Sequence, residues 1–159
     1  MTAQFDYTSF DRPDDDRQLA CILDRCFISP PEYTTTEQDY LNCVGKENLR
    51  FIRQNGEILG GLVILNMGQW YGSTCVPMAG IASVGIAPHH RGSGAAIALM
   101  QSTVKELYAQ GTPISVLYPA VQQLYRQAGY EQAGILCQWE AKIDRIQMRD
   151  RTLSMSEID

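Results

Sequence analysis

The sequence predicts a single domain of mixed α+β class. The chain has 159 residues, close to the size of one domain. Hydrophobic residues make up 45% of it and charged residues 19%, which is ordinary for a folded globular protein. Apolar residues repeat at helical spacing in some segments and alternate at strand spacing in others. Two helices, an antiparallel meander and then alternating strands and helices give a mixed order of elements.

The N-terminal elements are predicted from apolar spacing and capping residues. A lead-in strand is expected over 4–7, and a helix over 14–27, where the apolar residues form one stripe. A second helix is expected to begin at Thr35, because Thr35 and Gln38 fit a capping box. Gly45 is suited to end that helix, since glycine readily adopts the left-handed conformation at a helix C-terminus.

The rest of the chain is predicted to alternate between strands and helices. A strand begins at Leu49, and Asn55-Gly56 is a typical two-residue hairpin turn before a partner strand over 58–65. The further expected elements are a loop or hairpin connection over 66–73, strands over 75–79 and 81–87, a long helix over 94–110, a strand over 114–118, a short helix over 121–128, and one or two strands over 130–133 and 135–143.

Charge and hydropathy exclude several classes of protein. The formal net charge is −5, which argues against non-specific nucleic-acid binding, because that needs a surplus of positive charge. No apolar run approaches the 18 or more residues of a membrane span. The acidic N-terminal segment has no signal-peptide pattern. We therefore expect a cytoplasmic protein with no nucleic-acid or membrane partner.

The cysteines and histidines predict neither a disulfide framework nor a metal site. The cysteines are odd in number and no CxxC pattern occurs, so we expect reduced and mostly buried thiols. His89 and His90 are adjacent, and this spacing does not indicate a histidine-based metal cluster. Neither histidine can be assigned as the partner of a catalytic cysteine. The five cysteines are Cys21, Cys26, Cys43, Cys75 and Cys137.

The segment 83–96 predicts a strand, a glycine-containing turn and the beginning of a helix. Such a turn points unpaired N–H groups and the positive end of the helix dipole at one spot, which favours phosphate or pyrophosphate. Gly92 and Gly94 allow close approach of the backbone to an anion, and Arg91 can add a charge-assisted contact. On the residues alone, glycines that serve only to turn the chain are an equally good interpretation.

Two motifs in this half of the chain resemble those of the GNAT N-acetyltransferases. Val-x-Ile-x-Pro-x-x-Arg-x-x-Gly-x-Ala over 84–96 is similar to the acetyl-CoA pyrophosphate motif of that family, with Arg91, Gly94 and Ala96 at its characteristic positions. The run LYRQAGY over 124–130 is similar to the second signature, a tyrosine in a short helix followed by glycine and an aromatic residue. The separation of the two motifs also fits the family.

The resemblance implies a GNAT fold, with a mixed, mostly antiparallel sheet, a splayed parallel strand pair and about four flanking helices. The cosubstrate would be acetyl-CoA, with its pantetheine arm in the split between the strands over 81–87 and 114–118, and no metal would be needed. The acetyltransferase domain would cover 1–144, with 145–159 as a tail or the start of a linker. The implied cofactor-binding residues are Val84, Gly85, Ile86, Arg91, Gly92, Ser93, Gly94, Ala95, Ala96 and Ile97.

A finer resemblance links the chain to the first domain of Eis-type (enhanced intracellular survival) acetyltransferases. It is carried by Leu117-Tyr118-Pro119-Ala120, by the motif around Tyr125, and by Cys26-Phe27 with the helix that follows. Members of that group are much longer, and their C-terminal carboxylate reaches the active site of the first domain as a base. The chain would be either a shortened form of such a protein or a single-domain relative.

The implied reaction moves an acetyl group from acetyl-CoA to a primary amine by direct attack. Tyr125 matches the residue that protonates the departing CoA thiolate in the family. A phenol with an ordinary pKa near ~10 is protonated at neutral pH and can give its proton to a thiolate. On the residues alone, a core aromatic is the simpler interpretation of Tyr125, because its helix already carries an apolar stripe.

The base and the acceptor stay open at this stage. The strand over 81–87 has no carboxylate, so the base could be Asp24, Glu32 or Asp39, a water relay, or a carboxylate from a further domain. The acceptor could be a small-molecule amine, such as a polyamine or an aminoglycoside-like amine, or a lysine side chain. A homo-oligomer is compatible with the sequence. Four aromatic residues could line a pocket for a cationic amine or merely pack, namely Phe27, Tyr33, Trp70 and Tyr71.

Two other functions are compatible with these features. The missing local base would suit a non-catalytic module that binds acyl-CoA or assists assembly. A stand-alone structural domain with a degenerate cleft would bind no CoA.

Overall fold

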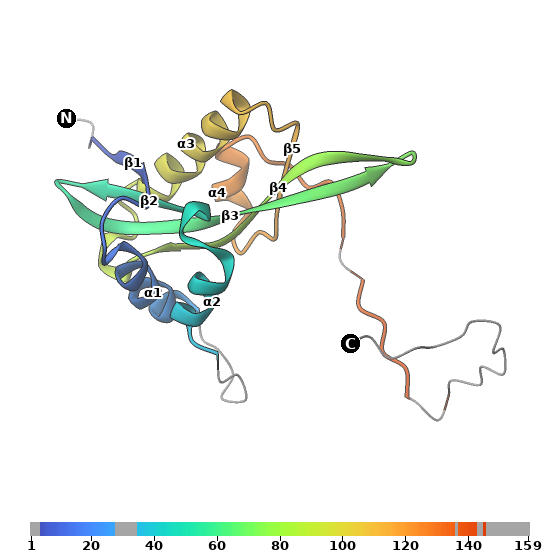
Figure 1. Cartoon of the computed structure of the whole chain (residues 1–159), viewed down its shortest axis with the longest axis horizontal. Helices are drawn as coiled ribbons and strands as arrows, with labels where there is room; N and C mark the ends of the chain where they lie inside the picture. Colours follow the sequence, from blue (N-terminus) through green and yellow to red (C-terminus); the bar gives the residue numbers. More distant parts are fainter. Residues whose placement is uncertain (1–3, 28–34, 136, 143–144, 146–159) are drawn as a thin grey trace.

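A five-stranded sheet crosses the protein, with a pair of helices on each face (Figure 1). The computed structural model describes residues 4–27, 35–135, 137–142 and 145. The strands lie in the order of the chain, and neighbours are antiparallel except β4 and β5, which are parallel. This confirms the predicted α+β class and the mostly antiparallel sheet. The strands are β1 (Asp6–Ser9), β2 (Leu49–Gln54), β3 (Glu57–Tyr71), β4 (Thr74–Ile86) and β5 (Ile114–Leu117).

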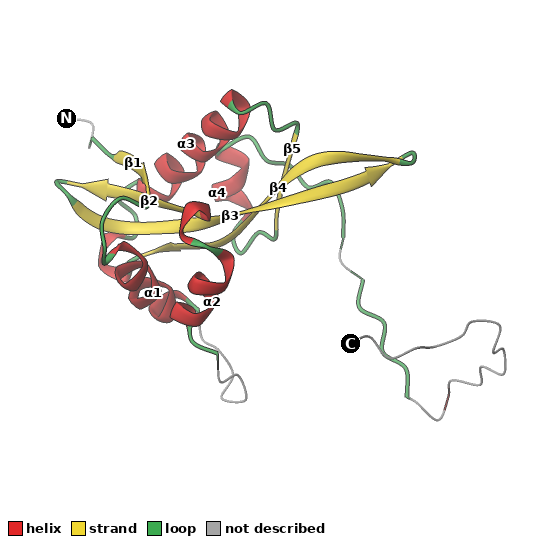
Figure 2. Cartoon of the chain, in the orientation of Figure 1, coloured by secondary structure: helices red, strands yellow, loops and turns green. Residues whose placement is uncertain are grey.

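Four α-helices and two short 3₁₀ helices complete the described elements (Figure 2). Helices α1 and α2 cover one face of the sheet, and α3 and α4 cover the other (Figure 1). None of the helices in the described ranges combines the length and apolarity that a membrane span requires. The helices are α1 (Asp15–Cys26), α2 (Glu37–Val44), η1 (Lys46–Asn48), η2 (Pro88–His90), α3 (Ala95–Ala109) and α4 (Gln122–Gln127).

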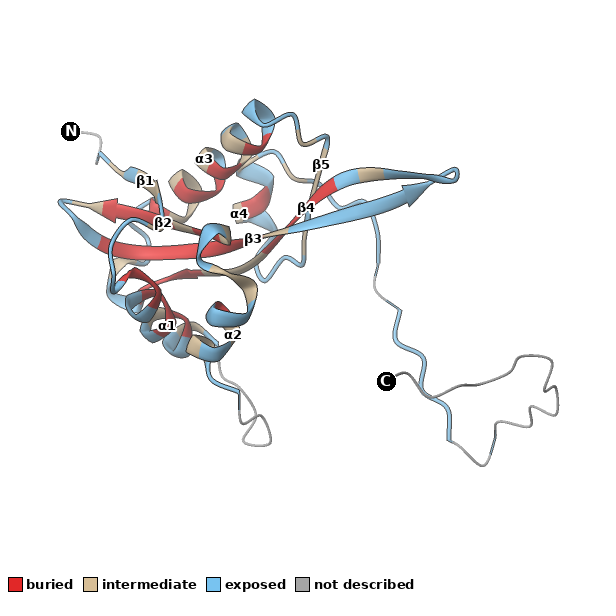
Figure 3. Ribbon diagram, viewed as in Figure 1, coloured by how far each residue is buried: buried red, intermediate tan, exposed pale blue. Residues whose placement is uncertain are grey.

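Successive side chains of β3 point to opposite faces of the sheet and contribute to a hydrophobic core on each face (Figure 3). Leu62 and Ile64 pack in the layer under α3 and α4, whereas Val63 packs in the layer under α1 and α2. Successive strand residues point to opposite faces, so a strand buried on both sides reads as a continuous apolar run. Each fully buried side chain of this kind contributes about 1.5–3 kcal/mol to folding. The apolar run over 58–65 is therefore the centre of the fold.

The capping residues of α2 lie one position later than predicted. Thr36, not Thr35, is the N-cap, and its hydroxyl accepts a hydrogen bond from the Asp39 N–H at 3.1 Å. The Asp39 carboxylate accepts from the Thr36 N–H at 3.1 Å, which completes a capping box without Gln38. Three consecutive threonines allow either register, and the aspartate at the third helical position selects this one. Gly45 ends the helix with a φ of 87°, as predicted.

The second hairpin is longer than the sequence suggests. Asn55 and Gly56 have φ values of 52° and 85°, as the first hairpin turn requires. The predicted loop over 66–73 is wrong in its first part, because β3 continues to Tyr71 and only Gly72-Ser73 makes the turn. The two strands expected over 75–87 are one strand, since continuous pairing with β3 holds the chain extended. The hairpin tip extends beyond the helices (Figure 1).

Two further predictions are corrected by the structure. No strand forms within 130–135 or 137–142, because a strand needs a backbone partner and no backbone hydrogen bond joins these residues to β5. The Tyr130 hydroxyl lies 2.7 Å from Ser115 Oγ of β5. Residues 136 and 143 lie outside the described residues. The cysteines are not mostly buried, since Cys26 is half-buried and the other four are exposed. All five are free thiols.

Candidate active site

The parallel strands β4 and β5 separate part-way along β4. They pair only from Met78 with Ile114 to Ile81 with Leu117. β5 ends at Leu117, whereas β4 continues for five more residues to Ile86. The backbone of this last part of β4 has no strand beside it on the β5 side. The separation matches the splayed pair that the sequence predicts.

A bulge in β4 lies where the two strands separate. Between Ala82 and Gly85, β4 has one residue more than the segment of β3 that it pairs with. Ser83 lies inside this interval with a φ of 50°, which serine seldom adopts. Bulges bend a strand and re-aim its backbone groups. The predicted contact segment 84–86 therefore begins at the bulge.

The beginning of α3 is left without a capping side chain. Gly94 is its N-cap in the left-handed conformation, with a φ of 92°, and Gly92 has a φ of 80°. The Ser93 hydroxyl accepts a hydrogen bond from the Ala95 N–H at 3.3 Å, but no side chain caps the helix by the usual contact to its second or third residue. The first N–H groups of a helix have no intrahelical partner. Apart from that of Ala95, they remain as donors for an anion, assisted by the helix dipole.

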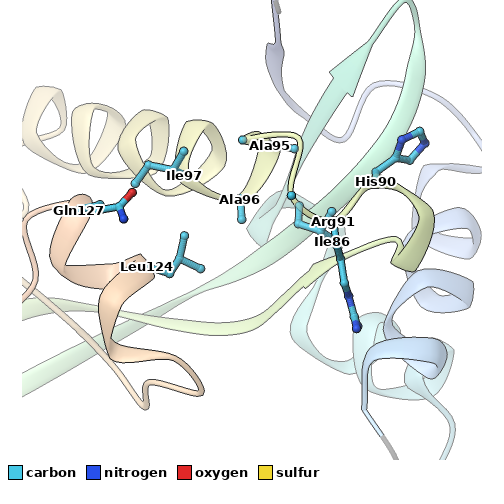
Figure 4. A pocket seen from close by; sticks show the side chains of 10 residues that line it. Ile86, His90, Arg91, Ala95, Ala96, Ile97, Leu124 and Gln127 are labelled. Atoms are coloured by element: carbon cyan, nitrogen blue, oxygen red, sulfur yellow. The ribbon is translucent and has the colours of Figure 1, made fainter.

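A pocket of about 330 Å³ lies at this helix start (Figure 4). The end of β4 and the glycine turn form one side, and Leu124 and Gln127 of α4 face Ile97 on the other (Figure 4). The pocket brings together most of the predicted cofactor-binding residues, but Val84, Gly85 and Ser93 are not in its wall. It is lined by Ile86, His90, Arg91, Gly92, Gly94, Ala95, Ala96, Ile97, Leu124 and Gln127.

Arg91 does not direct its charge toward the helix start. Its side chain extends toward α1 (Figure 4), and the guanidinium donates to Cys26 Sγ at 3.8 Å. The Cys26 thiol in turn donates to the Ile86 carbonyl at 3.3 Å. In this conformation, an anion at the turn would therefore be bound by backbone N–H groups and the helix dipole.

Tyr125 lies on α4 between the core and a second cavity of about 810 Å³. Its side chain is 6% exposed and packs edge-on against the Tyr130 ring, with centroids 6.4 Å apart. Within the described part of the chain, no hydrogen bond forms to its hydroxyl. The segment 115–119 of β5 and the following loop form part of the cavity wall. Tyr125 therefore has the packing role considered above and also reaches a cavity beside the splayed strands.

Burial raises the pKa of Tyr125 above its ordinary value, and the neighbouring Tyr130 raises it further. The phenol therefore keeps its proton throughout the physiological pH range. Because it stays in its acid form, such a group can donate a proton to a base that forms beside it, such as a thiolate. It is poorly suited to remove a proton from an amine.

Comparison with known proteins identifies the family. The sequence profile of the acetyltransferase (GNAT) domain matches residues 12–133. The chain belongs to the GNAT acetyltransferases. The matched range contains both motifs, the splayed strands and Tyr125. No curated protein sequence matches the chain.

Solved structures of GNAT proteins share this architecture. A GCN5-related N-acetyltransferase from Anabaena variabilis is 52% identical, with a TM-score of 0.75 over 82% of this chain and 33% of its own. A second one from Kribbella flavida is 29% identical, with a TM-score of 0.63 over 79% of this chain and 32% of its own. Eis1 from Mycobacterium abscessus is 17% identical, with a TM-score of 0.64 over 78% and 30% of the two chains, and so shares the fold. The chain spans about a third of the length of these three relatives.

Of the three carboxylates proposed as a base, the two that the structure describes do not line either cavity. Asp24 is exposed on α1, and Asp39 is held by the capping box, where hydrogen bonds from Thr36 lower its pKa. Glu32 lies outside the described residues. Glu131, which the sequence analysis missed, lines the larger cavity, but Arg126 donates to it at 2.6 Å and thereby lowers its pKa.

The predicted aromatic pocket is not assembled by the aromatics first considered. Trp70 is 71% exposed and lies with Tyr71 at the hairpin tip, whereas Phe27 follows the end of α1. Tyr33 lies outside the described residues. The larger cavity takes its aromatic side chains from α4 and from the segments that follow β5 and α4, namely Tyr125, Tyr118 and Tyr130. Tyr118 and Tyr130 belong to the sequence motifs named above. Their closeness to Tyr125 in the sequence was the signal that could have identified them as cavity residues.

Proposed function

We propose that the chain is an N-acetyltransferase domain that transfers an acetyl group from acetyl-CoA to a primary amine. The observation that carries the proposal is the uncapped start of α3, where left-handed Gly92 and Gly94 open the backbone to a pocket. Free N–H groups at a positive helix end suit a pyrophosphate. The pocket adjoins the end of β4, so a ligand anchored there can extend into the split between β4 and β5.

Acetyl-CoA supplies an activated acetyl group as a thioester. The backbone of 84–86, which pairs with β3 on one side and is not paired with β5 on the other, is proposed to bind the pantetheine arm and to polarise the thioester carbonyl through an N–H group, by the logic of an oxyanion hole. The amine nitrogen then bonds to the carbonyl carbon and loses a proton to a base or to water, and the carbon–sulfur bond breaks. Tyr125 gives its phenolic proton to the departing thiolate and is later reprotonated from solvent.

The source of the base decides between this proposal and a binding module. No carboxylate occurs in β4, and the described carboxylates near the cavities are engaged elsewhere. By its resemblance to Eis-type proteins, the chain would receive a carboxylate from a further domain, in accord with relatives of which only about a third is matched by this chain. A non-catalytic acyl-CoA-binding module is the second candidate, and this lack of a local base is the observation that favours it.

Several coarser expectations accompany the proposal. The acetyltransferase domain is proposed to cover 1–144 with a tail or linker over 145–159, a boundary that falls outside the described residues except for 145. The protein is proposed to work in the cytoplasm without a metal in its acetyl-transfer site. The acceptor is proposed to be a small-molecule amine or a lysine side chain.

The test is a pair of glycine variants measured by calorimetry with acetyl-CoA. Gly94→Glu places a carboxylate beside the proposed pyrophosphate, where two charges about 4 Å apart repel by about 4 kcal/mol at an effective dielectric constant near 20. That corresponds to a roughly thousandfold weaker affinity. Gly111→Glu is the matched control, because Gly111 also has a positive φ and open space around it, but lies at the other end of α3.

The two variants share the added charge and the backbone strain of a non-glycine residue at positive φ, about 1–3 kcal/mol. Parent and Gly111→Glu should therefore bind acetyl-CoA alike, whereas Gly94→Glu should not bind measurably. Equal affinity of all three proteins would move the cofactor site elsewhere. Turnover on a panel of amines, measured on the parent beside binding, separates an enzyme from a binding module.

A further inference from the structure

Glu57, His89 and His90 form a cluster that the proposed acetyl transfer does not use. Glu57 is the first residue of β3, directly after the Asn55-Gly56 turn, and the histidines belong to η2. One carboxylate oxygen and one ring nitrogen from each histidine lie within 4.8 Å of one another. The two imidazole rings are 4.2 Å apart between centroids. The first β-hairpin thus brings a carboxylate to two adjacent imidazoles.

We propose that this cluster binds a divalent transition-metal ion, with zinc as the best fit. Two imidazole nitrogens and a carboxylate oxygen are a donor set that zinc accepts, whereas calcium and magnesium prefer oxygen donors alone. Copper(II) and nickel(II) would bind by the same donors. Three protein ligands leave one position of a tetrahedral ion for water or another ligand.

The geometry already meets the main distance requirement. Zinc lies about 2.0–2.1 Å from nitrogen and about 2.0–2.2 Å from oxygen, so tetrahedral ligand atoms are roughly 3.3–3.5 Å apart. His90 Nε2 lies 3.3 Å from Glu57 Oε1. The His89 ring nitrogen lies within 4.8 Å of both other donors, and the ring is exposed, so that it has room to move toward an ion.

The site lies on the outer side of η2. His90 borders the pocket at the start of α3, but its ring points away from Ala96 and Leu124 (Figure 4). Glu57 and His89 are exposed, so an ion reaches the cluster without any opening of the fold. Solvent-exposed ligands give a moderate affinity, and we expect a Kd of ~1–100 µM. None of these observations depends on the binding of acetyl-CoA.

The test uses the fact that the chain has only two histidines. Zinc chloride is titrated into the full chain under reducing conditions, and the imidazole proton resonances are followed by NMR. Both histidines should shift in a saturable way that fits one ion, and magnesium chloride should shift neither. Histidine signals that stay unchanged while zinc binds would assign the metal to the exposed cysteines and overturn the proposal.

Two glutamate variants test the carboxylate. Glu57→Gln keeps the size of the side chain but removes its charge, and should weaken zinc binding at the histidines by at least about tenfold. Glu47→Gln is the matched control, because Glu47 is an exposed glutamate outside the cluster and its loss should leave the affinity unchanged. Equal affinities of parent and Glu57→Gln would reduce the site to adventitious binding by a histidine pair and overturn the three-ligand proposal.

Discussion

Replacing Tyr125 with Phe separates proton donation from packing. The ring stays and fills the same space, but the only proton that the side chain can donate is lost. Because no hydrogen bond to the Tyr125 hydroxyl forms among the described residues, the free energy of unfolding should change little. If proton transfer to the thiolate limits the step, kcat should fall by ~10²–10⁴-fold with acetyl-CoA affinity nearly unchanged.

Tyr130→Phe is the matched control, because this tyrosine packs against the Tyr125 ring and its hydroxyl lies 2.7 Å from Ser115 Oγ. Loss of that hydrogen bond should cost about 0.5–1.5 kcal/mol. For a domain of this size, each kcal/mol corresponds to about 2–4 °C in Tm. Tyr130→Phe should therefore have a lower Tm and an unchanged kcat, whereas Tyr125→Phe should have an unchanged Tm and a lower kcat.

The assay combines steady-state turnover with thermal melting for both variants. An acyl donor with a better leaving group needs less help from a proton donor, so Tyr125→Phe should recover activity with it. Since burial raises the pKa of Tyr125, loss of its proton should not limit the parent rate below about pH 10. A parent-like kcat for Tyr125→Phe would refute the reasoning and leave Tyr125 as a packing residue.

Three further outcomes are expected. Asp15→Asn should lower the free energy of unfolding by about 3–5 kcal/mol in denaturant titrations. The side chain of Arg53 is only 4% exposed and its guanidinium lies 2.6 Å from Asp15 Oδ1, so the substitution leaves a buried charge that is paired, among the described residues, only with the exposed Asp11. Burial raises the pKa of Asp15, but hydrogen bonds from Arg53 and from the N–H groups of Asp11 and Arg12 bring it below the ordinary 3.8. The parent should therefore lose this stability only as pH falls below about 4. If the free energy of unfolding of Asp15→Asn changed with pH as steeply as that of the parent, this assignment would be contradicted. Trp70→Ser should leave both Tm and the acceptor KM within error, because the side chain is 71% exposed at the hairpin tip, and a raised KM would place the acceptor there.

Local signals predicted most of the fold. Asn55-Gly56 carries its own conformational preference, and the positive φ values of Gly92 and Gly94 are what a backbone-lined anion site needs. The length of the hairpin over 57–86 was missed because Gly68 was interpreted as part of a loop or connection and the strands were separated at Gly80, whereas pairing between long strands overrides local propensity. The absence of a strand within 130–135 and 137–142 shows the converse, since alternation without a partner gives no strand.

Contacts between segments that are distant in the chain could not be predicted from the sequence. The direction of Arg91 depends on Cys26, which lies 65 residues earlier in the chain. The cluster at η2 depends on Glu57, which a hairpin brings to His90 from 33 residues away. Tyr118 and Tyr130 were visible as motif residues, but their place in one cavity wall with Tyr125 follows only from the fold.

The central claim is acetyl transfer, and mass spectrometry of the reaction with isotopically labelled acetyl-CoA tests it most directly. The full chain is incubated with a panel of polyamines, aminoglycoside-like amines and lysine peptides. The account predicts that one class gains the labelled acetyl group on nitrogen, with one free CoA thiol released for each acetyl group. Because the described residues offer no local base, the rate should lie below the usual enzymatic range of ~1–10³ per second. Acetyl-CoA that binds but is consumed no faster than in buffer, with every amine tested, would contradict the account.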